Sequence, residues 1–308
     1  MLMIAMRLCL ALFLLGSAVE AALAQTPEVM EVSRFHDGKK VVLKPVIHWP
    51  TGNGPFGAVV VVNSSGGKGD AFLSATHPVM NKAGIAVVYL DTFTPRVISD
   101  TGRDQTQISS TEMAIDALNV ADALRRHPRI KPEKIALQGQ SKGAIAALHA
   151  ATREWHAYSG NTLKPFDASV AFAPSCELQF REPELVSPLF AMLGEKDDFT
   201  LPGPCAKLFE RMKAAKQNVT FEVVPGANHT WSTSGTFHDP TFYTLRKCAE
   251  TPMFYTKSGF VNSRDGTLVK FQDIYRTCEA RGSMVGGPRD KQTYILEKAS
   301  AWLKQNGW

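Results

Sequence analysis

A serine between two glycines is the first group in this sequence that could do covalent chemistry. The segment "GQSKG" at 139–143 places Ser141 after the apolar stretch "KIAL" and before the small-residue run "AIAALHAA". A serine between a buried strand and a helix can sit on a sharp turn that projects its hydroxyl from a sheet edge, where it can attack a carbonyl carbon. Side chains at positions 139 and 143 would collide with the neighbouring strand and helix, so both positions require glycine. Ser141 is therefore a candidate nucleophile.

A serine hydroxyl needs a general base, and the base needs a carboxylate that orients it. In chains with this turn the order is serine, then the acid, then histidine. The segment "LFAMLGEKDDFT" supplies Asp197 and Asp198 after one apolar stretch, and "FEVVPGANHTW" supplies His229 after the next. We predict His229 as the base, with His238 as its rival. The spacing Gly-x-x-Asp-x-x-Thr at 194–200 favours Asp197 as the acid, with Asp198 as the alternative.

Acyl transfer also needs backbone N–H groups that bind the oxyanion of the tetrahedral intermediate. One donor is expected at Lys142, the residue after the nucleophile, and the other in the loop after the early buried strand. That loop is "NSSGG" at 63–67, where we predict Ser65, with Ser64 as the alternative. The Lys142 ammonium could attract an anionic substrate. We expect it to point to solvent, because the predicted role of this residue uses its backbone.

The elements that must position these groups alternate between strands and helices. The apolar runs "GAVVVV", "IAVVYLD" and "KIALQG" are typical of strands that are buried on both faces of a parallel sheet. The clearest helix follows Ser109-x-x-Glu112, the pattern of a capping box. This alternation predicts an α/β fold, with a mostly parallel central sheet and helices on both faces. Residues 232–288 interrupt it, as an insertion before the last helix.

The N-terminal segment has the pattern of a secretory signal peptide. Arg7 precedes an apolar run at 8–16, and "ALA" fits a cleavage site near Ala24. The run is too short for a stable membrane anchor. We therefore expect residues 1–24 to be removed and residues 25–308 to form a single domain, secreted or periplasmic.

Cleavage would leave an even number of cysteines, which in an exported chain predicts disulfide bonds. Four cysteines allow three connectivities, and pairing each with its nearest neighbour would close two loops of similar length. These residues are Cys176, Cys205, Cys248 and Cys278.

The composition limits the classes of molecule that we expect the protein to bind. The chain is 44% hydrophobic and 20% charged, as is ordinary for a globular protein, and its net charge of +5 comes from scattered Lys and Arg. It shows no basic stripe or aromatic signature of nucleic-acid binding, so we expect no nucleic-acid partner. The predicted chemistry requires neither a metal nor an organic cofactor. The expected partner is a small-molecule ester or acyl substrate, and the sequence makes no prediction of oligomeric state.

Taken together, these residues resemble the dienelactone hydrolase family of α/β-hydrolases. The resemblance covers roughly residues 40–230 and the final helix, and it rests on "GQSKG", "GEKDDFT", "GANH" and "LDTFTPR". It implies the α/β-hydrolase fold and cleavage of carboxylic esters through a Ser-Asp-His triad and an acyl-enzyme intermediate. The resemblance to exported members also implies the pair Cys176–Cys205. The namesake enzymes use a cysteine nucleophile, whereas Ser141 points to ordinary ester chemistry.

Two kinds of alternative remain open at this stage. The chain could be a non-catalytic binding protein of the same fold, or an acyltransferase or peptidase that uses the same triad. The insertion at 232–288 could be a lid over the substrate, pinned by a Cys248–Cys278 pair, or a structural flap with a small core of its own. Its aromatic residues are Trp231 at its edge and Phe237, Phe242, Tyr243, Phe254, Tyr255, Phe260, Phe271 and Tyr275.

Overall fold

The structure is a computed structural model in which the predicted signal peptide, 1–24, lies outside the described residues. The described residues are 25–36, 38–69, 71–231, 235–287 and 289–308.

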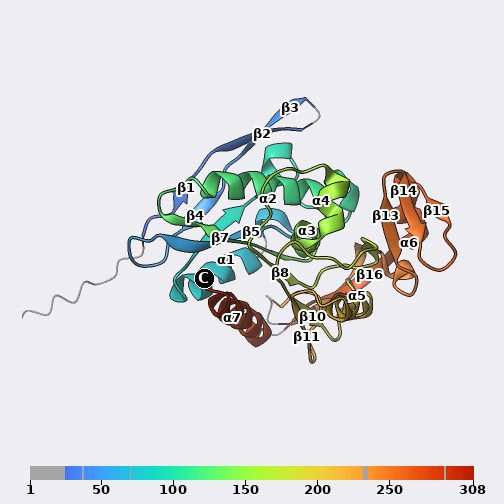
Figure 1. Cartoon of the computed structure of the whole chain (residues 1–308). Coiled ribbons are helices and arrows are strands. Elements are labelled where there is room, and N and C mark those ends of the chain that lie inside the picture. The colour runs from blue at the N-terminus through green and yellow to red at the C-terminus, as the bar shows by residue number, and fades with distance from the viewer. Residues whose placement is uncertain (1–24, 37, 70, 232–234, 288) are drawn as a thin grey trace, which may run out of the picture.

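Eight of the described strands form the central sheet: β1 (Glu28–Val29), β4 (Val46–His48), β5 (Phe56–Val62), β6 (Ile85–Leu90), β7 (Ile130–Gln140), β8 (Ala168–Phe172), β10 (Leu189–Gly194) and β11 (Val219–Val224). Their order across the sheet is β1-β4-β6-β5-β7-β8-β10-β11 (Figure 1). The strands from β6 to β11 are mutually parallel, and β4 and β1 continue one edge in antiparallel orientation. The predicted mostly parallel sheet is therefore present.

Helices cover both faces of this sheet: α1 (Ala71–Lys82), α2 (Ser110–Leu124), α3 (Lys142–Ala151), α5 (Pro202–Ala214) and α7 (Arg289–Gln305). Successive side chains of a strand point to opposite faces. Accordingly, Val60 of β5 packs with α2 and α3, whereas Val59 and Val61 pack with α1 and α7. In Figure 1, α2 and α7 lie on opposite sides of the sheet. The α/β-hydrolase architecture follows from strands that are apolar on both faces.

At the start of α2, Glu112 belongs to the predicted capping box and also pairs with a residue from a distant segment. Ser109 caps the helix as predicted, because its hydroxyl accepts the Glu112 N–H at 3.1 Å. The reciprocal half of the predicted capping box is not among the described contacts. The Glu112 carboxylate instead pairs with Arg34. Arg34 and Arg96 also bind the buried Asp116 of α2, at 2.5 Å and 2.7 Å.

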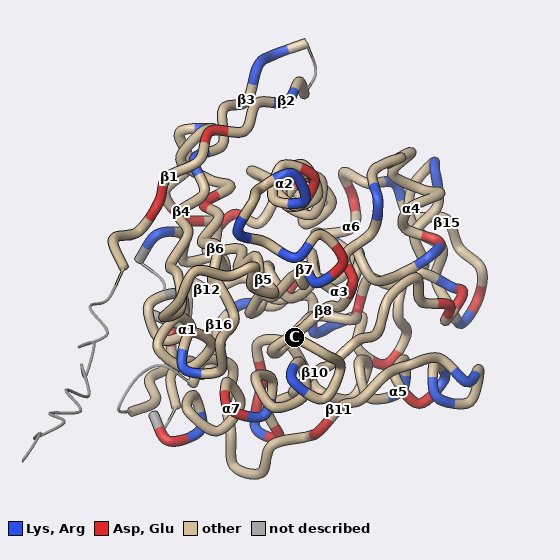
Figure 2. Tube along the Cα trace, turned by 60° about the vertical axis from the view of Figure 1, so that its left-hand side comes forward, with Lys and Arg blue, Asp and Glu red and all other residues tan. Residues whose placement is uncertain are grey.

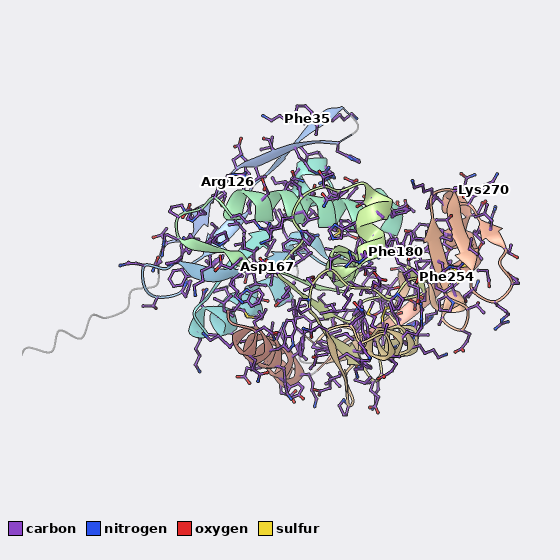
Figure 3. All side chains as sticks on the ribbon, viewed as in Figure 1. Phe35, Arg126, Asp167, Phe180, Phe254 and Lys270 are labelled. Atoms are coloured by element: carbon purple, nitrogen blue, oxygen red, sulfur yellow. A yellow bond between two sulfur atoms is a disulfide. The ribbon has the colours of Figure 1, made fainter. Side chains whose placement is uncertain are left out.

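An N-terminal hairpin stands away from the sheet beside α2. It consists of β2 (Val32–His36) and β3 (Lys39–Leu43), and the side chain of Phe35 lies near its tip (Figures 1 and 3). Both signs of charge are spread along the chain trace (Figure 2), as the scattered sequence positions predict. Among the described helices, none has the length and apolar character needed to cross a bilayer.

The insertion forms a layer of short strands beside the main domain (Figure 1). Two of its strands pair with each other as an antiparallel ribbon, β12 (Thr236–Thr244) with β16 (Ala280–Gly286). The segment between them forms a second sheet in the order β15-β14-β13-β9, in which β9 comes from the main domain. Its remaining elements are β9 (Leu178–Gln179), β13 (Met253–Thr256), β14 (Gly259–Asn262), β15 (Leu268–Val269) and α6 (Ile274–Cys278).

Two disulfide bonds brace these parts, with nearest-neighbour connectivity. Cys176–Cys205 joins the chain after β8 to α5, and Cys248–Cys278 closes the insertion. The Cα atoms of each pair lie 5.0 Å apart. The second bond lies in a small apolar cluster with Met253. Disulfide bonds of this kind are compatible with a secreted or periplasmic protein.

Candidate active site

Ser141 sits on the turn between β7 and α3, in a conformation that few non-glycine residues adopt. Its φ is 54° and its ψ is −120°. Positive φ is strained for a residue with a Cβ, and such strain persists only where the surroundings enforce it. Here the Ser141 N–H donates to the Phe172 carbonyl at 2.9 Å, and the Ser141 carbonyl accepts the Ile145 N–H at 3.0 Å. The turn therefore holds the serine at the carboxyl end of β7.

The two glycines around Ser141 are required by the closeness of neighbouring backbone. A Cβ on Gly139 would lie 2.2 Å from the carbonyl carbon of Gly143 in α3. A Cβ on Gly143 would lie 2.8 Å from the Asn63 carbonyl oxygen and 2.9 Å from that of Val62. Neither position has room for a side chain, which is the steric reason predicted for the motif.

Three predicted side chains meet at this edge of the sheet. His229 follows β11, and its Nε2 lies 2.8 Å from the Ser141 Oγ. Asp197 follows β10, and its Oδ2 lies 2.8 Å from the His229 Nδ1. Because a carboxylate can only accept, the Nδ1–H donates to Asp197, which leaves Nε2 free to accept from the serine hydroxyl. Asp197 and His229 are each 2% exposed, so solvent does not compete for these bonds.

The Asp197 carboxylate is fixed by its own loop. Its Oδ1 accepts the N–H groups of Phe199 at 2.9 Å and Thr200 at 2.8 Å. The Thr200 hydroxyl lies 2.9 Å from Oδ2, 3.0 Å from the His229 Nδ1 and 3.0 Å from the Ala173 carbonyl oxygen. These donors hold the carboxylate in one orientation toward the imidazole.

The two alternative residues lie elsewhere. The Asp198 carboxylate accepts the Met284 N–H at 2.8 Å, and its backbone carbonyl accepts from Arg246 at 2.9 Å. Asp198 therefore faces the insertion, whereas its neighbour Asp197 faces His229. His238 is exposed on β12, opposite Met284.

Both predicted oxyanion donors belong to the wall that contains Ser141. Ser65 and Lys142 line the same cavity as Ser141, whereas Ser64 does not. Within the described residues, neither backbone N–H has a hydrogen-bond acceptor. The Ser64 hydroxyl instead accepts the Gly66 N–H at 3.2 Å, inside the loop. Two unsatisfied donors beside the candidate nucleophile are suited to bind an oxyanion.

The prediction that the Lys142 ammonium points to solvent is wrong. The residue is only 5% exposed, and its Nζ donates to the Gln105 carbonyl oxygen at 2.8 Å and to the Gln105 Oε1 at 3.1 Å. The reason is tertiary, because the loop that carries Gln105 lies over the first turn of α3. Burial lowers the pKa of Lys142 to about 7.

A second buried ionisable group lies behind the site. Glu177 is 1% exposed, and the Ser175 hydroxyl donates to its Oε2. Its Oε1 has no hydrogen-bond partner among the described residues. Burial raises the pKa of Glu177, and the negative charge of Asp197 raises it further. A raised carboxyl pKa means that folding shifts this carboxyl toward its neutral form, relative to the unfolded chain.

A cavity of about 700 Å³ opens beside Ser141 between the main domain and the insertion. A volume of this size is within the range of sites for small organic ligands. Among its described lining residues Lys142 is the sole charged group, and none is Asp or Glu. Trp231, which marks the edge of the insertion in the sequence, is instead buried in the core near Phe172.

Sequence reasoning missed two residues of this site. Gln105 belongs to a short 3-10 helix, Gln105–Gln107, and nothing in the sequence links it to Lys142. Phe199 places its ring edge-on to the His229 ring, with the centroids 4.4 Å apart. An aromatic residue two positions after the acid is the signal that could have found Phe199. The motif "LDTFTPR" lies outside the site, and its Arg96 serves the ion pair with Asp116.

Residues 44–239 match the sequence model of the dienelactone hydrolase family, which is more than half of the chain. The chain belongs to the dienelactone hydrolase family. Members of this family hydrolyse esters, so the protein is a carboxylic-ester hydrolase. The matched range ends within β12, so most of the insertion lies beyond the part that is common to the family.

Solved structures of similar architecture share the fold of this chain. Esterase 2 from Thermogutta terrifontis, phosphoramylated by tabun or in its apo form, is 18% identical with a TM-score of 0.50, over 66% of this chain and 84% of that one. A dienelactone hydrolase candidate from Klebsiella pneumoniae subsp. pneumoniae MGH 78578 is 16% identical with a TM-score of 0.50, over 67% and 88%. At such identities the likeness shows a shared fold. No curated protein matches the chain.

Proposed function

We propose that the protein is a serine esterase in which Ser141 is the nucleophile, His229 the general base and Asp197 the acid that orients it. One observation carries the proposal. The Ser141 Oγ, the two imidazole nitrogens and the Asp197 Oδ2 form one chain with both hydrogen bonds at 2.8 Å. Catalytic hydrogen bonds of this type fall at about 2.6–3.2 Å.

The proposed reaction has two halves. Ser141 Oγ bonds to the carbonyl carbon while its proton moves to the Nε2 of His229. Collapse of the tetrahedral intermediate breaks the carbon–oxygen bond of the ester, and the imidazolium returns the proton to the leaving alcohol. A water molecule then attacks the acyl-enzyme by the same route, which releases the acid. Asp197 holds the imidazole in the required tautomer and stabilises its positive form.

The oxyanion of each intermediate would be bound by the backbone N–H groups of Ser65 and Lys142. Their location in the cavity wall and their lack of other described acceptors support this role. A donor of this kind typically contributes about 3 kcal/mol to transition-state stabilisation.

We also propose that the protein acts outside the cytoplasm, after removal of residues 1–24. The two disulfide bonds support an oxidising compartment. Expression with the native N-terminus, followed by N-terminal sequencing of the mature protein, tests the cleavage near Ala24. Retention of residues 1–24 on the mature protein would contradict the proposal.

The nucleophile can be tested by covalent labelling. A fluorophosphonate probe should label the folded protein, and peptide mass spectrometry should place the adduct on Ser141. Ser141→Ala should abolish both labelling and hydrolysis of p-nitrophenyl acetate. Ser263→Ala, in an exposed loop of the insertion, should retain both. Full esterase activity in Ser141→Ala would refute the assignment.

The acceptor of the acyl group needs a separate test, because the same three residues could transfer it to an alcohol or cleave an amide. Products of a standard ester should be analysed in the presence of increasing n-propanol or glycinamide, and an amide analogue should be assayed in parallel. We expect the free acid to dominate. A transfer product that dominates at low acceptor concentration would indicate an acyltransferase instead.

A further inference from the structure

Seven aromatic residues are among the described residues that line the cavity beside Ser141. Two come from the main domain and five from the insertion, which lies mostly beyond the range that matches the family. The aromatic lining residues are Tyr158 and Phe199 of the main domain and Tyr243, Tyr255, Phe260, Phe271 and Tyr275 of the insertion.

One of these rings, Phe199, lies beside His229, and the others pack against one another in pairs and small groups. Phe199 contacts the His229 ring, as described above. Farther out, the Tyr255 ring lies 5.7 Å from Tyr158 and 4.9 Å from Phe260, centroid to centroid. Phe260 in turn lies 5.3 Å from Phe271 in a T-shaped arrangement. The spacings are those of favourable aromatic pairs, so a substrate ring could join the series with the same geometry.

The insertion presents these rings as a fixed wall. Strand β13 pairs with the two-residue strand β9 of the main domain, which attaches the sheet of the insertion to that domain. The Cys248–Cys278 bond closes the insertion, and Phe260 packs in the same small apolar cluster as that bond. Phe180 of the main domain and Phe254 of the insertion lie where the two parts meet (Figure 3). A wall that is already ordered binds a ring without the added entropy cost of ordering its own side chains.

The electrostatics of the cavity favour an uncharged ring. Lys142 is the sole charged residue among the described lining, and its ammonium already donates to Gln105. The polar lining groups are hydroxyls and amides, among them Ser109, Thr111 and Gln272. Groups of this kind bind hydroxyl or ester oxygens without requiring a charge on the ligand.

We propose that the insertion gives this enzyme a preference for esters that carry a neutral aromatic ring, in the acyl or the alcohol part. The inference rests on the proposed function of Ser141, since it concerns the substrate of that site. Stacking and edge-to-face contacts with several rings should distinguish an aromatic ring from a saturated ring of similar size.

Matched substrate pairs test the preference and locate the ring. Methyl benzoate against methyl cyclohexanecarboxylate probes the acyl part, and benzyl acetate against cyclohexylmethyl acetate probes the alcohol part. We expect kcat/KM to favour the aromatic member of at least one pair by about tenfold, the effect of one or two good aromatic contacts. Ratios near one in both pairs would overturn the inference, and Ser141-dependent hydrolysis in the same assay would leave the proposed function standing.

Variants connect the preference to the insertion. Phe271 is 41% exposed, so Phe271→Leu should fold normally, and it should lower the aromatic ratio in the preferred pair. Tyr275→Leu should act in the same direction. Phe254→Leu is the matched control, because that ring packs against Arg181 outside the cavity lining. An unchanged ratio in both cavity variants would contradict the role of the insertion.

A binding measurement separates the cavity from the chemistry. Titration of Ser141→Ala with methyl benzoate and methyl cyclohexanecarboxylate, or with the preferred pair, should show tighter binding of the aromatic ester. Equal affinities would count against the inference even if the wild-type enzyme hydrolysed neither ester.

A separate set of hydrogen bonds carries a second inference, about Gln105. Its Nε2 donates to the Ser65 hydroxyl at 3.0 Å, and its Oε1 accepts from the Lys142 Nζ at 3.1 Å. The same loop is joined to Ser65 by the Thr101 N–H, which donates to the Ser65 carbonyl at 2.8 Å. One side chain thus links the two residues whose N–H groups form the proposed oxyanion hole.

We infer that Gln105 is a positioning residue that fixes the distance between these two N–H groups. Gln105→Ala should lower kcat by about tenfold or more with KM changed less than about twofold, because misplaced donors affect the transition state more than the bound ester. Gln105→Glu should restore most of kcat, since its carboxylate can accept from both Lys142 and the Ser65 hydroxyl. Gln107→Ala is the control, because that side chain binds Asp100 and Asp104 outside the cavity lining. A change in KM alone, or no rescue by Gln105→Glu, would refute the role.

Discussion

Replacement of Lys142 by methionine should change how the stability of the protein depends on pH. Burial lowers the pKa of this lysine in the folded protein to about 7, from an ordinary value of 10.5. Between these two values the unfolded chain holds a proton that the folded protein has released. Stability therefore rises with pH across this window, because the unfolded state binds more protons there.

The size of the effect follows from the width of the window. A difference of one bound proton changes the free energy of unfolding by about 1.4 kcal/mol per pH unit. Since Lys142 is only half deprotonated in the fold at pH 7, we expect the destabilisation that it causes to fall, and stability to rise, by about 2 kcal/mol between pH 7 and pH 9. Lys142→Met removes the titrating group and fills nearly the same volume, so the variant should lack this rise.

Urea unfolding of both proteins at pH 6, 7, 8 and 9, with the disulfide bonds intact, measures the difference directly. Subtracting the two curves removes the contributions of other titrating groups. The stability gap between variant and wild type should move by about 2 kcal/mol in favour of the wild type from pH 7 to pH 9. Lys207→Met serves as the control, since that side chain is 72% exposed and its gap should stay constant. Parallel curves for Lys142→Met and the wild type would refute the reasoning.

Three further outcomes follow from the structure. Asp197→Asn should lower kcat by about 10⁴-fold, because the imidazole loses its required tautomer, whereas Asp198→Asn should retain most activity; comparable losses in steady-state assays would contradict the assignment of the acid. Glu177→Gln should raise the thermal midpoint at pH 7 more than at pH 4, because the raised pKa of the buried carboxyl makes the wild type lose stability as pH rises above the ordinary carboxyl range. An equal shift at both pH values would contradict a raised pKa of Glu177. Replacing Cys248 and Cys278 together by serine should lower the free energy of unfolding by about 3–4 kcal/mol, because the bond restricts the entropy of the unfolded loop. A loss below about 1 kcal/mol in urea titrations would contradict this contribution of the disulfide bond.

The parts of the site that the sequence could predict are those encoded in short segments with a fixed order along the chain. Parallel strands end at one edge of the sheet, so side chains that directly follow β7, β10 and β11 must lie near each other. That is why Ser141, Asp197 and His229 could be nominated without a structure. The glycines at 139 and 143 could also be predicted from a short segment. The turn between β7 and α3 places the backbone of one residue so close to that of another that neither position can hold a Cβ.

The remaining features depend on contacts between distant segments. Lys142 is buried by the loop that carries Gln105, more than thirty residues earlier in the chain. That loop has no periodic pattern of apolar residues from which its position could be predicted. The capping box at Ser109 is only half formed, because Arg34 of the hairpin takes the Glu112 carboxylate. The sequence also marked the aromatic residues of the insertion without separating Trp231, which packs in the core, from Phe260, which lines the cavity. Such outcomes are decided by tertiary packing, on which local pattern carries no information.

The neighbouring residues Asp197 and Asp198 have a consequence for how the enzyme could be re-engineered. One carboxylate holds the histidine and the other holds β16, so a change at the base of the insertion would disturb the catalytic loop. The outer part, residues 245–279, is closed by its own disulfide bond and enters and leaves through the paired ends of β12 and β16. We therefore expect that exchange of this outer part alone would alter the proposed substrate wall and leave the proposed catalytic residues in place. The exchange should keep the Asp198–Met284 contact and a strand edge that pairs with β9.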